Sequence, residues 1–256
     1  PGRHDGQYGS REMNTAMTLF RREFVSYFVT PVAYVFIVIF LALLGAMTFF
    51  LGGFFGRGQA DLAPFFAFHS WLYLLLIPAV SMRLWSDERK TGTIELLLTL
   101  PVSPTVAVVA KFLAAWAFAA IALALTFPFW LTVNYLGAPD NGVIVAGYVG
   151  SLVMAGAFLA IGSCFSTAAK NQVIAFVLAV MVSLVFTVAG TPLVLEFVSG
   201  WAPRPVIDVI AGLSFIANFD AISKGVLDLV NLIYFLSVMA LFLFINVVLV
   251  NTLKAR

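Results

Sequence analysis

Lysine, arginine, aspartate and glutamate are absent from several stretches of this chain that exceed the roughly 18 residues typical of a membrane span. Soluble domains are about half apolar and about a quarter charged, whereas this chain is 62% hydrophobic and 10% charged. The sequence therefore predicts an all-α, polytopic membrane protein. Its 256 residues leave room for one membrane domain and for no sizeable soluble one.

Six apolar segments are long enough to be transmembrane helices. The first has 21 residues, which at 1.5 Å per residue gives roughly 31 Å, about the thickness of one hydrocarbon core. The third is longer than a bilayer needs, so it begins in the cytoplasm or its Lys111 extends back to the headgroups. The predicted spans are Pro31–Leu51, Ala63–Met82, Thr105–Tyr135, Val143–Phe165, Gln172–Pro192 and Asn231–Thr252.

The distribution of basic residues predicts the orientation. If the N-terminus is inside the cell, eleven of the fourteen Lys and Arg residues are cytoplasmic, which is a strong positive-inside bias. We therefore expect a bacterial inner-membrane protein with both termini in the cytoplasm. Residues 1–14 are polar and rich in Gly and Arg, and they predict a disordered tail before a membrane domain over residues 15–256.

Apolar residues recur at three- and four-residue steps in "MTLFRREFVSYF", directly before the first span. This period predicts a helix that lies in the membrane interface, and Pro31 favours a break after it. The alternative is a simple cytoplasmic extension of the first span. The residues assigned to the interfacial helix are Phe20, Arg21, Arg22, Glu23 and Phe24.

Two further segments have a distinctive pattern. Residues 193–230 are too polar to span the membrane and too apolar for a free loop, so we expect one or two short helices on the extracytoplasmic surface. Gly147, Ser151 and Ala155 form a row of small residues in the fourth span. Such a row allows close helix packing, either within one subunit or between two.

The stretch "RLWSDERKTGTIELLLTLPVSP", residues 83–104, concentrates charge in one cytoplasmic loop. Thr93 can cap a short helix that carries Glu95 in its first turn, and Pro101 ends this helix. The helix has a leucine-rich surface that needs a covering. It either rests on lipid headgroups or docks into a groove on a cytoplasmic protein, and the pattern alone leaves both interpretations open.

The same stretch strongly resembles the signature E-R-x-x-G-T-x-E-x-L-L-x-x-P of ABC-2 type transporter permeases. "FRREFVSYFVTPVAYVF" and "FIANFDAISKGVLDLVNLIYFLSVMALFLF" look like the branch typified by the gliding-motility permease GldF. The resemblance implies that this loop carries the coupling helix, which docks onto a cytoplasmic ATPase subunit. The matching residues are Glu88, Arg89, Gly92, Thr93, Glu95, Leu97, Leu98 and Pro101.

The resemblance also implies the partners. Two copies of an ABC ATPase would bind ATP and Mg²⁺, and a second permease, identical or related, would complete the transporter. Membrane lipids and an extracytoplasmic auxiliary subunit are further expected partners, whereas nucleic acid is not. This chain lacks the GxxxxGK[ST] loop, so we expect no ATP hydrolysis, no catalytic residue and no bound cofactor or metal in it.

The spans contain no charge cluster for a small ion, and their abundance of Phe and Leu favours a lipid-like or otherwise bulky cargo. The alternative is a subunit that transmits force to an outer partner, or a structural subunit, without transport. Cys164 is expected to be a small buried residue. His69 is expected to be a hydrogen-bonded structural residue, with a polar pathway lining as the alternative. Pro78 and Pro192 are predicted bending points of the pathway spans.

Overall fold

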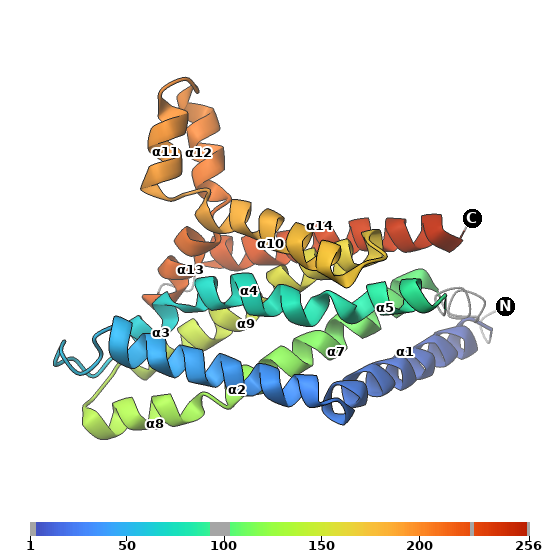
Figure 1. Ribbon diagram of the computed structural model, residues 1–256, viewed down its shortest axis with the longest axis horizontal. Helices are drawn as coiled ribbons and strands as arrows, with labels where there is room; N and C mark the ends of the chain where they lie inside the picture. The colour runs from blue at the N-terminus through green and yellow to red at the C-terminus, as the bar shows by residue number, and fades with distance from the viewer. Residues whose placement is uncertain (1–3, 93–102, 226–227, 255–256) are drawn as a thin grey trace.

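The computed structural model describes residues 4–92, 103–225 and 228–254, and these residues form helices and connecting turns without strands. The helices α2, α4 continued by α5, α7, α9, α10 and α14 run side by side along the long axis (Figure 1). The helices are α1 (His4–Val29), α2 (Pro31–Ala46), the π-helical turn η1 (Met47–Leu51), α3 (Ala63–Ala67), α4 (His69–Ser81), α5 (Arg83–Thr91), α7 (Pro104–Ala124), α8 (Phe127–Leu136), α9 (Asn141–Ala168), α10 (Gln172–Val188), α11 (Pro192–Ser199), α12 (Arg204–Gly212), α13 (Phe215–Ser223) and α14 (Leu229–Lys254).

Four helical segments of the described residues are long and apolar enough to cross a membrane, and they coincide with the predicted spans one, three, four and six. These segments are Pro31–Leu51, Pro104–Leu136, Asn141–Ala168 and Leu229–Lys254. Two bent pairs raise the number to six if each pair is one span. They are α10 with α11, bent by 77°, and α12 with α13, bent by 61°.

The predicted second span, Ala63–Met82, differs from the structure. The chain is divided there into α3, α4 and α5 by single-residue breaks at Phe68 and Met82, and no single helix of spanning length results. Pro78 lies inside α4 and has no amide hydrogen to donate to the preceding turn, and the helix ends three residues later. α4 and α5 nevertheless follow one direction through the bundle (Figure 1).

Helix α9 occupies the centre of the bundle. It packs against α14, α10, α4, α13, α7 and α5, and most of its side chains are buried. Glycines of α9 allow close approaches: a Cβ added to Gly147 would lie 2.5 Å from the Phe66 ring, and one added to Gly162 would lie 1.8 Å from Ser81 Oγ. The predicted row of small residues therefore serves close packing within this subunit.

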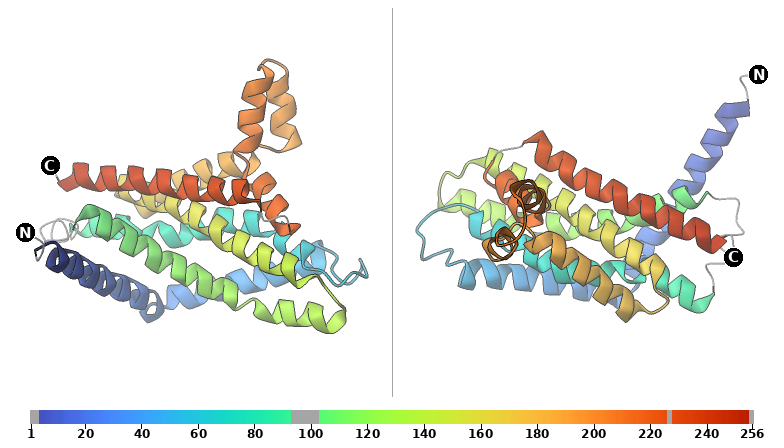
Figure 2. Two further views of the ribbon diagram at one scale, coloured as in Figure 1. Left: turned by 180° about the vertical axis from the view of Figure 1, so that it is seen from behind. Right: turned by 90° about the horizontal axis from the view of Figure 1, so that it is seen from above.

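The N-terminal helix ends where the sequence predicts a break. Thr30 has an extended backbone between α1 and α2, and Pro31 occupies the first turn of α2. α1 packs along α7, and in the view from above it extends away from the bundle while α2 stays within it (Figure 2). A position of α1 in the membrane interface stays a prediction.

The first residues of α1 differ from the expected disordered tail. The helix begins at His4 and includes residues 4–14. Propagating an existing helix adds one hydrogen bond for each residue fixed, so the amphipathic part of α1 can extend backwards through a polar sequence.

The segment between α10 and α14 is helical, as predicted, but only part of it packs on the bundle. α11 and α12 form a hairpin that projects at a steep angle from the long axis (Figure 1). α12 has no buried residue, and Leu193, Phe197 and Trp201 are strongly exposed. α13 instead returns to the bundle, where it buries Phe215, Phe219 and Ile222.

Candidate functional site

Helix α5 is joined to the bundle by side chains from several helices, beginning at its first turn. The amides of Trp85 and Ser86 donate to Ser166 Oγ on α9 at 3.0 and 3.1 Å, and Ser166 Oγ donates to the Met82 carbonyl at 2.7 Å. Met82 has no side chain that caps α5, so α9 supplies the acceptor that the first amides of a helix need. The start of α5 is therefore held against α9.

Arg89 attaches the other end of α5 to the last turn of α9. Its guanidinium donates to the carbonyls of Thr167 at 2.5 Å and of Ala168 at 2.7 Å. The last carbonyls of a helix have no partner within the helix, and they carry its negative partial charge. A guanidinium therefore stabilises them both through hydrogen bonds and through its positive charge. Two turns of α5 are thereby fixed to one helix end.

Asp87 connects α5 to α10. Its Oδ1 accepts a hydrogen bond from Gln172 Nε2, in the first turn of α10. The turn between α9 and α10 is thus held by Arg89 on one side and by Asp87 on the other.

Glu88 contacts the only lysine of α7. Lys111 Nζ lies 2.9 Å from Glu88 Oε1 and 3.1 Å from Glu23 Oε2 on α1, and the lysine side chain is 2% exposed. The ammonium also lies 5.2 Å from the centre of the buried Trp85 ring, within the range of a cation–π contact. Three helices therefore meet at one buried ammonium group.

Arg22 completes this charge cluster by donating to Glu23 Oε1 at 2.6 Å. Burial raises the pKa of Glu23, but Lys111 and Arg22 outweigh that effect, so the pKa lies below its ordinary value. Glu23 is consequently ionised at neutral pH, and the buried lysine has the counter-charge that a low-dielectric site requires.

We expected either the third span to begin in the cytoplasm or Lys111 to extend back to the headgroups. The side chain instead pairs with two carboxylates of the chain itself, while a cytoplasmic start of the span stays a prediction. The side chain turns inward because carboxylates from α1 and α5 lie within ion-pairing distance of its ammonium. We refer to the contacts of Asp87, Glu88 and Arg89 with α7, α9 and α10, together with the Lys111–Glu23 pair that reaches α1, as the α5 network. Ser166 and Gln172 were not recognised from the sequence, because each is about eighty residues from its partner and is an ordinary polar residue at a helix end.

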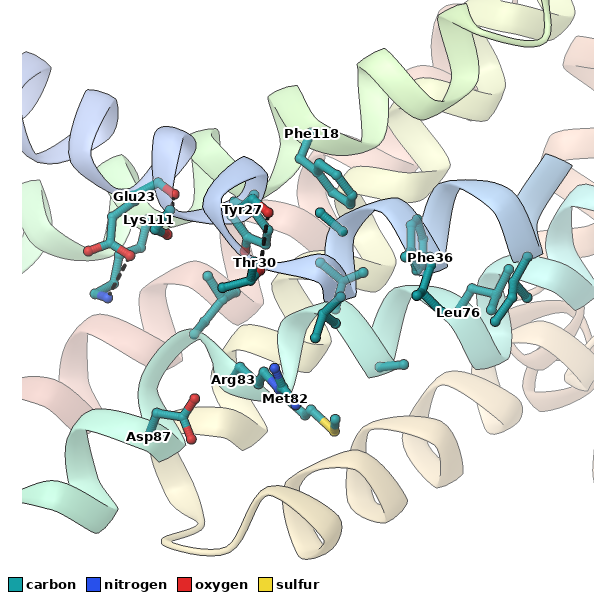
Figure 3. Close-up of a pocket in the computed structure, with 18 of the residues that line it drawn as sticks. Glu23, Tyr27, Thr30, Phe36, Leu76, Met82, Arg83, Asp87, Lys111 and Phe118 are labelled. Atoms are coloured by element: carbon teal, nitrogen blue, oxygen red, sulfur yellow. Dashed lines mark hydrogen bonds and ion pairs between the residues drawn. The ribbon is translucent and has the colours of Figure 1, made fainter.

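A cavity of about 460 Å³ lies between α1 and α2 on one side and α4 and α5 on the other (Figure 3). Its walls are apolar along α2 and α4, and they become charged where α5 begins. Glu88 Oε2 is buried and has no hydrogen-bond partner among the described residues. The cavity therefore has an apolar end and a charged end that carries an unsatisfied acceptor.

The predicted docking residues are only partly described. Glu88 and Arg89 have partners within this chain, and contact with another protein stays a prediction for both. Gly92 ends α5 with a φ of +74°, a left-handed conformation that favours glycine. The remaining matching residues lie outside the described residues: Thr93, Glu95, Leu97, Leu98 and Pro101.

The residues assigned to the interfacial helix lie on different sides of α1. Phe20 and Phe24 are half-buried and stack with ring centres 5.8 Å apart, whereas Arg21 is exposed. Glu23 points to the charge cluster and Arg22 pairs with it. The part of α1 that contacts α7 therefore contributes directly to the α5 network.

The predicted pathway residues do not meet at one site. His69 is fully buried, donates through Nδ1 to the Phe65 carbonyl at 2.9 Å, and lies among aromatic rings. Pro78 is buried in α4, and Pro192 begins α11 at the 77° bend after α10. A pathway role for these residues stays a prediction.

Cys164 is buried, and the described residues contain no group of three or more His, Cys, Asp or Glu that could hold a metal ion.

Comparison with known families gives one match. The model of a family described as ABC-2 family transporter protein matches residues 18–190. The matched region includes every residue of the α5 network and both sides of the cavity, and it ends before α11. No curated protein matches this chain.

Proposed function

Because this chain belongs to the ABC-2 family of transporter proteins, we propose that it is the permease subunit of an ABC exporter in the bacterial inner membrane. A separate cytoplasmic ATPase, present in two copies, binds ATP and Mg²⁺ and supplies the energy. Two permease chains, identical or related, form the transport pathway. The stretches before the first span and after α12 support placing this chain in the branch typified by the gliding-motility permease.

The observation that carries this proposal is the position of the α5 network. α5 ends at Gly92, directly before residues 93–102, which contain most of the signature for ATPase docking. Its side chains bond to α7, α9 and α10, and Lys111 of α7 also pairs with Glu23 of α1. A displacement imposed on residues 93–102 by an ATPase would therefore reach four helices of the membrane domain at once.

The orientation of the bundle agrees with this role. The start of α1, the end of α5 and the end of α14 lie at one end of the bundle, and the turn between α8 and α9 lies at the other (Figure 1). We assign the first end to the cytoplasm, because most of the basic residues lie there. The ATPase would then approach both termini and the docking loop from the same side.

The cargo is proposed to be lipid-like or otherwise bulky. The long helices expose apolar side chains over most of their outer surface, including Val38 on α2 and Val185 on α10. The described spans present no array of polar side chains that would replace the hydration of a sugar or an ion.

A second function is favoured by the projecting hairpin. α11 and α12 expose apolar residues on the extracytoplasmic side and make few contacts with the bundle. Such a hairpin could engage an extracytoplasmic auxiliary subunit and transmit the ATPase cycle to it without export. Cargo-dependent ATP hydrolysis distinguishes the two functions.

The test is co-purification of the ATPase with this chain, followed by ATP turnover in proteoliposomes. Export predicts that ATP turnover rises with a lipid-like cargo. Stimulation by a small hydrophilic solute, with none by lipids, would contradict the cargo class. Failure of any ATPase to co-purify with the chain would contradict the permease assignment itself.

A further inference from the structure

The cavity beside α5 has an apolar part and a charged part, which match the acyl chain and the headgroup of a membrane lipid. Apolar side chains of α2 and α4 line one part of it, among them Phe36, Ile39 and Leu76. The other part holds charged side chains of α5 together with Glu23 and Lys111 (Figure 3). The volume of about 460 Å³ lies in the range of small-molecule pockets, about 300–1,000 Å³.

The depth of the charged end matches the headgroup region of a bilayer. Pro31 begins the first apolar span, and the charged side chains lie next to this end of the span, while Phe36 and Ile39 lie one to two turns further into it. Val32, Val35 and Ile39 line the cavity and are also 47%, 55% and 42% exposed. The apolar part is therefore open sideways, toward the acyl chains of the surrounding lipid.

Two groups at the charged end have unused hydrogen-bonding capacity. Glu88 Oε2 is a buried acceptor that has no hydrogen-bond partner among the described residues, and only Oε1 of this carboxylate contacts Lys111. The guanidinium of Arg83 lines the cavity, is exposed, and has no hydrogen bond or ion pair to any described residue. One group needs an N–H or O–H donor, and the other needs an anion.

The overall charge of the lining narrows the choice of headgroup. Three carboxylates, those of Glu23, Asp87 and Glu88, line the cavity together with two cationic side chains, Arg83 and Lys111. The net negative charge opposes a headgroup that is only anionic, while Arg83 alone can accept a phosphate. A headgroup with a phosphate and an adjacent ammonium satisfies both requirements.

We propose that this cavity binds a phospholipid whose headgroup carries a primary ammonium, as in phosphatidylethanolamine. The phosphate pairs with Arg83, the ammonium donates to Glu88 Oε2 and to the carboxylate of Asp87, and one acyl chain follows the apolar wall along α2 and α4. A choline headgroup has no N–H to donate to Glu88, and a glycerol headgroup has no cation for the carboxylates.

This inference goes beyond the proposed function, because a lipid can occupy the cavity whether or not it is transported. Lipid binding is nevertheless connected to the proposed function, because Glu88 belongs both to the cavity and to the α5 network. A bound ammonium would share Glu88 with Lys111, and the occupant would contact the helix that leads to the docking loop.

The experiment uses the full chain, purified without an ATPase, so that failure of the proposed function does not affect the result. Native mass spectrometry measures the phospholipid retained from micelles that contain equal amounts of dioleoyl phosphatidylethanolamine, phosphatidylcholine and phosphatidylglycerol. We expect the ethanolamine lipid to be retained about tenfold over the other two, because a hydrogen bond to a charged group is worth about one decade or more in affinity.

Two variants locate the binding. Arg83→Gln should reduce retention of all three lipids, because each of them carries the phosphate that pairs with this guanidinium. Ala79→Trp places a large ring in the cavity wall and should reduce retention of all three lipids. Ala240→Trp, on an exposed position of α14, is the matched control and should change nothing.

Equal retention of the three lipids by the unmodified chain would overturn the proposal, and so would a preference for phosphatidylglycerol. These outcomes need no variant, so they stand even if Ala79→Trp fails to fold. Unchanged retention in a folded Ala79→Trp chain would also overturn it, because the lipid would then bind elsewhere. Equal binding of soluble phosphoethanolamine would show that the apolar wall does not contribute, against the proposal.

Discussion

Lys111 Nζ on α7 lies 2.9 Å from Glu88 Oε1 on α5, and the lysine side chain is 2% exposed. The two residues are 23 positions apart, with the docking loop between them. A buried ammonium is costly unless it is paired, so this contact and the one with Glu23 specify how α5 lies against α1 and α7. The orientation of α5, which leads to the predicted docking loop, thus depends on one buried charged group.

Removing this ammonium should destabilise the chain strongly. Lys111→Met leaves Glu88 and Glu23 without their shared partner, and breaking a buried ion pair from one side costs about 3–5 kcal/mol. The double variant Lys111→Met with Glu88→Gln should lose less than the sum of the two single variants, because it leaves fewer unpaired charges. The measurement is the free energy of unfolding in detergent.

The control for this experiment is an exposed pair. Lys224 lies 2.5 Å from Asp220 and is 69% exposed, so Lys224→Met should change the free energy of unfolding by about 0.5 kcal/mol or less. A similar loss in both variants would show that burial of Lys111 is not what makes its contacts important.

Arg89→Ala should uncouple ATP turnover from transport while the ATPase still binds. The guanidinium contacts the carbonyls of Thr167 and Ala168, so its loss detaches α5 from the end of α9 within this chain. Loss of charge-assisted hydrogen bonds worth about 1.5–3 kcal/mol should lower cargo-stimulated turnover about tenfold or more. Lys90→Ala, at the exposed neighbouring position, is the control. Loss of ATPase binding in Arg89→Ala would indicate instead that Arg89 contacts the ATPase.

Truncating the leucines of the docking loop should weaken ATPase binding. Leu97→Ala or Leu98→Ala should cost about 1–3 kcal/mol in binding if each side chain is a buried interface anchor. Glu95→Lys should disturb the same contact, because it places a positive charge near a helix N-terminus. The assay is a pull-down of the ATPase, with Leu193→Ala on the exposed hairpin as control. Normal binding after replacement of Glu95, Leu97 and Leu98 together would mean that this segment only rests on headgroups.

Labelling of introduced cysteines should place α5 in the cytoplasm. Lys90 near the end of α5 and Arg57 between η1 and α3 are exposed, and these two segments lie at opposite ends of the bundle (Figure 1). The native Cys164 is buried and should react slowly. Lys90→Cys should be modified by a membrane-impermeant maleimide only after the cells are opened, and Arg57→Cys should be modified in intact cells. The reverse pattern would contradict the proposed orientation.

Acid should weaken the attachment of α1 to the bundle. The pKa of Glu23 is lowered from its ordinary value of 4.5, so its stabilising contribution is fully present above that pH. The contribution is lost as the pH falls through the lowered pKa, because the folded state must then bind a proton. Melting temperatures measured down through this range should fall less in Glu23→Gln than in the unmodified chain. Parallel curves would show that Glu23 is not responsible.

The sequence predicted the long helices well, because uncharged stretches of spanning length leave few alternatives. Pro31 also predicted the break after α1, since proline restricts the residue before it. The division of the second predicted span depends on where α9 offers Ser166 as an acceptor for the amides of α5, and this long-range contact has no local signal. The role of Lys111 was missed for a similar reason: its carboxylate partners come from two other helices.

The close approach of Gly162 to Ser81 determines which parts of the bundle can move. The Ser81 side chain lies directly against the Gly162 backbone and leaves no room for a further atom, so α4 is closely packed on α9 at this point and a sliding motion between the two helices would meet a clash. On its opposite side α4 borders the cavity, where α2 has room to shift. α1 is anchored through Glu23, and the chain changes direction at Thr30. A conformational change in this subunit would therefore rotate α2 about Thr30, and the width of the cavity would change in each transport cycle.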